Sequence, residues 1–441
     1  MEQRRKNLTQ LFIPICLETL LYMLSGMVDT LMLSSVNDQA VGAVGTANTY
    51  IGIFIIMFSV ISSGMVAVMT QNIGAGRPGG AYQARQLGLA FNAVLGIIMS
   101  LFLSLGAGTI LSGVGVADAL MQPAKTYLQI VGGFCILNAL IPICSSYLRA
   151  FGFSKEPLYA SIIGNVINFC LNAFFLFVLH KGVAGVATAT VISRIINLVI
   201  VVLLGAVLVK AKQHPERESN RAVMGQIIRI GLPSACETAI YNVSMTLVIR
   251  FLNQMDAQGL NVTARSYTMQ ITNFSYCVGA ALAQANAIMT GWHIGAKEYD
   301  ACDRGTRKAA IIGVIVAVIL ETMFALCSGW IMQLFSKDPQ MVSLVGKLLA
   351  IDIVLEMGRV TNLVYGQALK TSGDAVFPVV MGACFMILCS VGGTYLFGIR
   401  LGLLAVGAYI GMAGDECVRA VGMYLRWKSG KWKEKGLVKS R

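Results

Sequence analysis

The chain has 441 residues, of which 56% are hydrophobic and only 12% are charged, and its mean hydropathy is +0.71. Soluble globular proteins carry about 25% charged residues, so this composition excludes a soluble domain. A net charge of +13 suggests nucleic acid as a partner only in a soluble chain, and we expect none here.

Apolar stretches long enough to cross the membrane recur along the whole chain. A helix needs about 20 residues to span about 30 Å of hydrocarbon. Hydropathy predicts twelve spans, at residues 8–34, 42–70, 87–113, 126–148, 158–180, 183–209, 227–253, 262–292, 309–335, 341–369, 376–399 and 402–426. The predicted fold class is therefore an all-α integral membrane protein with twelve transmembrane helices.

The basic residues are distributed unevenly between the two sides of these spans. The amino terminus, the even-numbered loops and the carboxyl tail hold 24 of the 34 Lys and Arg residues, and the odd-numbered loops hold four. By the positive-inside rule, we expect a multi-pass protein of the plasma (inner) membrane with both termini cytoplasmic. The basic tail, residues 427–441, contains Trp427 and Trp432 and is predicted to anchor to anionic lipid.

The sequence repeats itself at an offset of about 220 residues. Three motifs recur in the same order: Pro14-x-x-x-Glu18-Thr19-x-x-Tyr22-x-x-Ser25 at Pro233, Ile73-Gly74-Ala75 at Ile294, and Leu148-Arg149-x-x-Gly152-x-x-x-x-Pro157 as Leu369-Lys370-x-x-Gly373-x-x-x-x-Pro378. Such order and spacing indicate the duplication of a six-helix unit.

The duplication predicts two homologous lobes. We expect an N-lobe at 1–209, a cytoplasmic linker at 210–226, a C-lobe at 227–426 and the basic tail at 427–441. Because six is even, both copies start on the same side, and the lobes are predicted to be related by a pseudo-twofold axis along the membrane normal. Two lobes that rock around a site near the midplane are typical of secondary transporters.

The first span carries a stripe of polar residues. Glu18, Tyr22, Ser25 and Asp29 are spaced 4, 3 and 4, which places them on one helix face, and we expect this stripe to look into the lobe interior. The second copy repeats the first three as Glu237, Tyr241 and Ser244, but has Val248 in place of Asp29. Since ionisable groups in hydrocarbon cost about 2.5–3.5 kcal/mol each, Asp29 is a candidate functional carboxylate.

The fifth and sixth spans supply oxygen and amide groups that could serve Asp29. Asn165, Asn168 and Asn172 share one face, and Thr188 and Thr190 follow. Beside such groups a carboxylate can carry a proton, because desolvation favours its neutral form, or it can bind Na⁺. The alternative is that these side chains only form hydrogen bonds between helices.

In the C-lobe, the tenth span carries Asp352, Glu356, Arg359 and Asn362 on one face. Glu356 and Arg359 can pair at i, i+3 and fix the helix, or they can take part in substrate binding or gating together with Glu237. Pro14 either starts the first helix or permits a bend in it.

Short motifs recur in order along the chain: Val28-Asp29-Thr30, Gly74-Ala75-Gly76, Leu148-Arg149-x-x-Gly152, Asn168 and Gly182-x-x-Gly185-x-Ala187. Through these motifs the chain resembles the multidrug and toxic compound extrusion (MATE) family along nearly its whole length. The resemblance implies antiport, in which organic and often cationic, amphipathic compounds leave in exchange for H⁺ or Na⁺.

The resemblance also implies site residues. The ion-coupling cluster would be Asp29, Asn168, Asn172 and Thr190, with a possible Na⁺ at Asp29, and Pro14 would be the hinge. Many relatives have a second aspartate at the position of Asn172, followed by proline in place of Ala173, so the identity of the ion stays open. Glu237, Tyr241, Asp352, Glu356 and Arg359 are candidates for a substrate or ion site in the C-lobe, because other relatives use carboxylates there.

Two functions other than export are alternatives. A flippase of related fold would move a lipid-linked precursor and would line its cavity with several cations. An intramembrane enzyme would need paired metal-binding aspartates or a histidine within a span, and His180, His214 and His293 all lie near loops. We expect a transporter rather than an enzyme, with no cofactor, that acts as a monomer on small organic molecules and a coupling cation in the lipid bilayer.

Overall fold

The computed structural model describes residues 6–34, 38–113, 116, 118–209, 218–256, 259–333 and 335–438. Within these ranges the regular structure is entirely helical, which confirms the predicted all-α fold class. The chain divides into two compact units, Met1–Gly231 (unit 1) and Leu232–Arg441 (unit 2). The division falls inside a helix that begins at Asn220, so the end of the predicted linker 210–226 is helical, and residues 210–217 lie outside the described residues.

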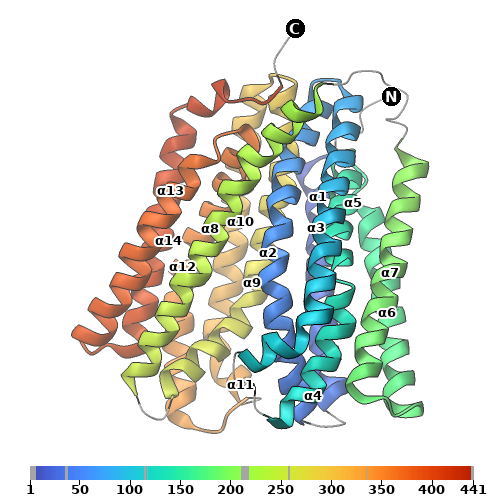
Figure 1. Cartoon of the computed structure of the whole chain (residues 1–441). Helices are drawn as coiled ribbons and strands as arrows, with labels where there is room; N and C mark the ends of the chain where they lie inside the picture. The colour runs from blue at the N-terminus through green and yellow to red at the C-terminus, as the bar shows by residue number, and fades with distance from the viewer. Residues whose placement is uncertain are drawn as a thin grey trace. The chain divides into compact units, whose positions relative to one another are not determined.

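The described residues of unit 1 contain seven complete α-helices and the start of α8, and α6 and α7 lie side by side (Figure 1). The helices are α1 (Leu8–Ser34), α2 (Asp38–Gly74), α3 (Pro78–Gly113), α4 (Asp118–Tyr127), α5 (Ile136–Ala150), α6 (Lys155–Ala173) and α7 (Gly182–Leu208). Short π-helical segments follow α4 (Leu128–Gly132) and α6 (Phe174–Val178). Helix α1 packs mainly against α6, which sets the polar face of α6 opposite Asp29.

Unit 2 repeats this order, and its first helix starts before the division between the units. Its helices are α8 (Asn220–Met255), α9 (Leu260–Gly295), α10 (Tyr299–Leu326), α11 (Ser328–Met332), α12 (Pro339–Ser372), α13 (Val376–Phe385) and α14 (Leu404–Lys428). Two π-helical segments, Met386–Val391 and Thr394–Arg400, extend α13, and a 3₁₀ turn, Lys431–Glu434, follows α14. Helix α12 packs against α9, α10 and α14 and is the central helix of the unit.

Several helices, among them α2, α3 and α8, extend beyond the predicted spans because hydropathy marks only the part of a helix that lipid surrounds. In the described residues, seven helices are long and apolar enough to cross a membrane, and the pair formed by α4 and α5, bent by 42°, would make an eighth. Four further long helices, α8, α9, α12 and α14, carry more polar and charged residues. The predicted span 309–335 ends too late, since α10 stops at Leu326 and a break precedes α11.

Glycines allow close helix packing in unit 2. A Cβ atom added to Gly407 of α14 would lie 2.4 Å from the carbonyl carbon of Phe397, and one added to Gly411 would lie 2.8 Å from the backbone oxygen of Cys389. Lipid offers helices no hydrophobic driving force to associate, so close backbone contact through small residues is what holds such an interface. Helix α14 therefore packs directly on the backbone of the segment that ends α13.

The duplication is visible in the backbone dihedral angles. Four pairs of residues at offsets of 221 or 222 all adopt positive φ: Gly76 (74°) and Lys297 (60°), Gly152 (86°) and Gly373 (99°), His180 (49°) and Gly402 (69°), and Gly182 (52°) and Leu404 (54°). Left-handed residues are uncommon outside glycine, so their recurrence at matching positions is a specific signature. The two units thus share loop geometry even where the residue type has changed.

Both tryptophans of the basic tail are buried in unit 2, so they take no part in the predicted anchor to anionic lipid, which stays a prediction for the lysines of the tail. Trp427 and Trp432 are 2% and 1% exposed, and their rings stack on each other at 4.1 Å. The Nε1 atom of Trp427 donates to Asp303 at 2.8 Å, and that of Trp432 donates to the carbonyl of Trp427 at 2.9 Å. The sequence pattern was misleading because both indoles find hydrogen-bond partners inside unit 2, which suits them to burial.

Farther along the tail, ion pairs hold the segment that contains Trp432 against the end of α12. Lys435 and Arg426 both contact Asp374, at 2.6 and 2.7 Å, and Gly373 lies against the carbonyl of Lys435, where a Cβ atom would approach to 2.2 Å. Burial alone would raise the pKa of Asp374, but the hydrogen bonds from Arg426 and Lys435 outweigh it and hold that pKa below its ordinary value. We call residues 429–437 the C-terminal clasp.

Candidate functional site

Asp29 lies in the interior of unit 1 beside the asparagines of α6. The Nδ2 atom of Asn172 donates to Asp29 Oδ1 at 2.6 Å and also to Asn168 Oδ1 at 3.2 Å. Asn172 is fully buried, Asn168 is 5% exposed and Asp29 is half-buried. The structure therefore brings together three of the four residues of the predicted ion-coupling cluster.

The fourth member, Thr190, is buried on α7, but its hydroxyl donates to the carbonyl of Val186 at 2.9 Å, within its own helix. The amide oxygen of Asn172 is buried and has no hydrogen-bond partner. An unpartnered buried acceptor is costly, so this oxygen is available to a ligand. A single carboxylate with amide oxygens beside it can hold a proton, and these oxygens also suit a hard cation such as Na⁺.

The stripe on α1 divides into residues with different surroundings. Glu18 pairs with Arg149 of α5 at 2.5 Å and accepts a longer bond, 3.4 Å, from Ser161 of α6. Ser25 is half-buried, but Tyr22 is 68% exposed, so the prediction that the whole stripe faces the lobe interior is wrong for Tyr22. Pro14 is buried inside α1, and the helix continues through it.

An equivalent ion pair occurs in unit 2. Lys370 at the end of α12 contacts Glu237 of α8 at 2.5 Å, which is the counterpart of the pair between Arg149 and Glu18. Each pair joins the first helix of its unit, four residues after a proline, to the end of a later helix. Glu237 therefore has a cationic partner within unit 2, and Tyr241, one turn later, is half-buried.

The predicted residues of α12 belong to a buried charge network in unit 2. Arg359 contacts Glu356 and lies 3.4 Å from Glu416 of α14, which also accepts from Asn362 at 3.1 Å. Arg419 lies 2.9 Å from both Glu416 and Asp415. Glu356 thus forms the i, i+3 pair that its spacing predicts, but Arg359 also reaches a second helix.

Acids outnumber bases in this network. Asp352 is 2% exposed and Glu321 of α10 is fully buried, and neither contacts a cation within 4.0 Å in the described part of the chain. Both oxygens of Glu321 and one each of Asp352 and Glu356 have no hydrogen-bond partner. Buried ionised carboxylates without a counter-charge are very costly, so some of these groups must be protonated or must bind a cation.

Sequence reasoning assigned no role to Glu321, Asp415, Glu416 and Arg419. A usable signal was present for the last three, because their spacing of one, three and four residues places them on one face of α14. Glu321 offered no such signal, since it is the single acid in the apolar part of α10, residues 309–326. No group of three or more His, Cys, Asp or Glu side chains suited to a metal ion occurs among the described residues.

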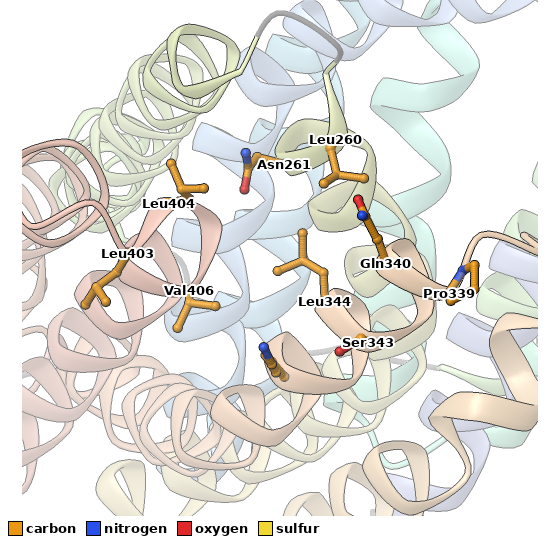
Figure 2. A pocket seen from close by; sticks show the side chains of 10 residues that line it. Leu260, Asn261, Pro339, Gln340, Ser343, Leu344, Leu403, Leu404 and Val406 are labelled. Carbon is orange, nitrogen blue, oxygen red and sulfur yellow. The ribbon is translucent and has the colours of Figure 1, made fainter.

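A pocket of about 520 Å³ opens at one end of unit 2, where α9, α12 and α14 begin (Figure 2). Four of its ten lining residues are leucines, among them Leu260, Leu344 and Leu404. Asn261 accepts from the backbone of Ala405 at 3.1 Å and donates to Asp256. Burial would raise the pKa of Asp256, but hydrogen bonds, including those from Asn261 and Leu260, lower it, so this carboxylate caps α9 in its charged form.

Charged residues buried inside long apolar helices, in two units that repeat each other, define a multi-pass membrane transporter rather than an enzyme. A family model described as MatE matches residues 14–174 and 233–396, once in each unit. The chain belongs to this family, multidrug and toxic compound extrusion, and is a secondary transporter with twelve transmembrane helices in two lobes.

Relatives and solved structures match the chain over nearly its full length. The uncharacterized transporter YisQ of Bacillus subtilis is 33% identical over 431 residues, which cover 96% of this chain and 94% of YisQ. A probable multidrug resistance protein NorM of Thermotoga maritima is 23% identical and covers 98% and 94%. A crystal structure of a MATE protein in its bent conformation shares the fold, with a TM-score of 0.88 at 18% identity over 97% and 96% of the two chains.

Proposed function

We propose that this protein exports organic, cationic and amphipathic compounds in exchange for H⁺ or Na⁺ by alternating access. The observation that carries the proposal is the environment of Asp29. This carboxylate is half-buried inside a membrane helix and accepts a hydrogen bond from Asn172, yet no Lys or Arg nitrogen lies within 4.0 Å of it in the described chain. An intramembrane acid without a permanent ion pair is free to exchange its counter-charge.

The exchange follows from electrostatics. Ionised Asp29 attracts a cationic substrate, whereas a bound proton removes the charge and with it the attraction. Because the two cations compete for one carboxylate, each weakens the binding of the other by the same factor. One charge that falls through 100 mV supplies about 2.3 kcal/mol, which can drive appreciable uphill export of a solute.

The donor set favours a proton over Na⁺ as the coupling ion. A second carboxylate at the position of Asn172 would strengthen Na⁺ binding, but Asn172 is a neutral amide. The hydroxyl of Thr190 donates its hydrogen to a carbonyl of its own helix. A proton needs only the carboxylate and a site that desolvates it. Na⁺ remains the second candidate because the amide oxygen of Asn172 is unpartnered.

We place supporting roles on the other predicted residues. Pro14 lies in the half of α1 that precedes Asp29, so a bend there could couple the charge of Asp29 to the path of the helix. Acids outnumber bases around Asp352 and Glu356, so unit 2 contains a second candidate site for the coupling ion. Arg359 compensates part of the negative charge of these acids. The charge distribution of the loops supports cytoplasmic termini, and we expect a monomer in the inner membrane.

The alternative, a flippase for lipid-linked precursors, finds less support. Such a protein would present several free cations to a pyrophosphate, whereas two of the buried arginines, Arg359 and Arg419, each contact two carboxylates in unit 2. Their positive charge is already compensated. We therefore keep export of small organic compounds as the function.

Ethidium efflux from proteoliposomes under an imposed pH or Na⁺ gradient tests the proposal. We expect Asp29→Asn to abolish gradient-driven efflux, because an amide cannot change charge, while the thermal stability in detergent stays near that of the wild type. Asp300→Asn, at the start of α10, is the matched control and should transport normally. Unchanged efflux by Asp29→Asn would remove Asp29 from the mechanism, and Glu237→Gln would then be the next variant to examine.

A further inference from the structure

The pocket at one end of unit 2 is lined by three helices and has no part in the proposed function. Leu260 begins α9, Leu344 lies in the second turn of α12 and Leu404 begins α14, and their side chains surround one space (Figure 2). The volume of about 520 Å³ is within the range of small-molecule sites. Since α14 runs from this pocket to the C-terminal clasp, the two features lie at opposite ends of that helix.

The pocket lies near the boundary of the hydrocarbon layer. Three predicted spans begin at residues 262, 341 and 402, within two residues of Asn261, Gln340 and Leu404. Helix α12 has 34 residues and is about 51 Å long, so it extends about 10 Å beyond the hydrocarbon at each end when it is centred. Lys347, the ninth residue of α12, then lies about 12 Å from the start of the helix, where lipid headgroups meet acyl chains.

Lys347 is the single charged residue among the ten that line the pocket. Within the ranges that the structure describes, no carboxylate oxygen lies within 4.0 Å of its Nζ atom. Asp256 borders the pocket through Asn261, but its oxygens accept from the backbone N–H groups of Leu260 and Asn261 at 2.9 and 3.0 Å. The ammonium group of Lys347 is therefore left without an ion pair beside an apolar wall.

Leu404 keeps a strained backbone conformation at this wall. Its φ is 54°, in the left-handed region that favours glycine, and the matching residue of unit 1, Gly182, has a φ of 52°. A glycine would adopt this turn without strain but would contribute no side chain to the pocket. Strained residues cluster at ligand sites, so the leucine points to a role for its side chain there.

We propose that this pocket binds an anionic phospholipid, with an acyl chain against the leucines and the phosphate at Lys347. The inference concerns a second site and does not depend on the proposed export function. Within a bilayer, the leucines add van der Waals contact but discriminate little between lipids, because lipid tails are equally apolar. Selectivity therefore comes from Lys347, which attracts a lipid with a net negative charge more than one whose headgroup carries its own cation.

Native mass spectrometry of the full chain in detergent, titrated with dioleoyl phosphatidylglycerol or dioleoyl phosphatidylcholine, tests the proposal. The two lipids have the same acyl chains and differ in net charge. Lys347→Gln, Lys347→Arg and Leu404→Gly would be compared with the wild type, and thermal melts would establish that each is folded. Lys337→Gln is the matched control, because Lys337 is an exposed lysine just before α12 that does not line the pocket. Glycerol 3-phosphate, added as a competitor, presents the phosphate without acyl chains.

We expect the wild type to bind phosphatidylglycerol more tightly than phosphatidylcholine. Lys347→Gln should lower the affinity for phosphatidylglycerol about fivefold and leave that for phosphatidylcholine unchanged, the effect of one charge near the membrane surface. Lys347→Arg should keep the preference, and Lys337→Gln should bind as the wild type does. Leu404→Gly should bind both lipids more weakly yet melt at or above the wild-type temperature, because glycine relieves the strain at this φ.

Other outcomes overturn the inference. Equal losses in Lys347→Gln and Lys337→Gln would show that surface charge in general attracts the lipid. Equal affinity of the wild type for the two lipids, or unchanged binding in Leu404→Gly, would remove Lys347 or the leucine wall from the site. Displacement of the lipid by glycerol 3-phosphate would make the pocket a site for free phosphate. None of these results bears on dye export, so they leave the proposed function intact.

Discussion

The C-terminal clasp yields a prediction whose magnitude follows from burial. Trp432 is 1% exposed, stacks on Trp427 and meets Tyr299 edge-on at 5.8 Å. A buried tryptophan removes about 150–250 Å² from solvent, which at about 25 cal/mol per Å² stabilises docking by about 4–6 kcal/mol as an upper estimate. Truncations of buried aromatic residues to alanine cost about 3–5 kcal/mol. We therefore expect Trp432→Ala to weaken docking of the clasp more than about a hundredfold.

Hydrogen–deuterium exchange of the peptide that spans residues 429–437 measures this change. Its amides should exchange much faster in Trp432→Ala, and trypsin should cleave more readily after Lys431 and Lys433. Trp330→Ala is the matched control, because Trp330 is 71% exposed and its loss should leave the clasp unchanged. If the clasp stays equally protected in Trp432→Ala, burial of the indole does not hold it, and the reasoning from burial is refuted.

Two further predictions concern unit 2. Gly407→Val should lower the free energy of unfolding by about 3 kcal/mol, since its Cβ would lie 2.4 Å from a backbone carbon of Phe397, whereas Gly414→Val, with open space around it, should melt near the wild type in detergent. Because the pKa of Asp374 is lowered, the ion pairs of this carboxylate stabilise the docked clasp fully at pH values above the ordinary pKa of 3.8. This stabilisation is lost as the pH falls through the lowered pKa and the carboxylate becomes protonated. Clasp exchange, corrected for the intrinsic rate, should therefore be constant from about pH 5 to 8, and Asp374→Asn should raise it at pH 7; a steep change near pH 7 in the wild type would contradict this origin.

The sequence was sufficient for the fold because the fold depends on repeated, local signals. Hydropathy located every long helix, although it placed the end of α10 too late, since Ser328 and its neighbours are apolar enough to continue a span without continuing a helix. The motifs around Glu18 and Arg149 were each found as repeats. Their contact was not, because one sequence does not reveal which residues 131 positions apart meet.

The candidate site was only partly readable for a related reason. The spacing of Asn168 and Asn172 placed them on one face, and the packing of α1 against α6 then brings Asp29 to them. Periodicity gave Tyr22 the same face as Asp29, but how much of that face neighbouring helices cover depends on their tilt and position.

The matching ion pairs, Glu18 with Arg149 and Glu237 with Lys370, bear on how the polypeptide could be assembled. Each ion pair forms within one copy of the repeat, so neither pair needs a residue of the other copy. If the gene is divided between the two copies, each of the two fragments should therefore insert and fold alone. Co-expression of the fragments would then be a practical way to label one half for spectroscopy.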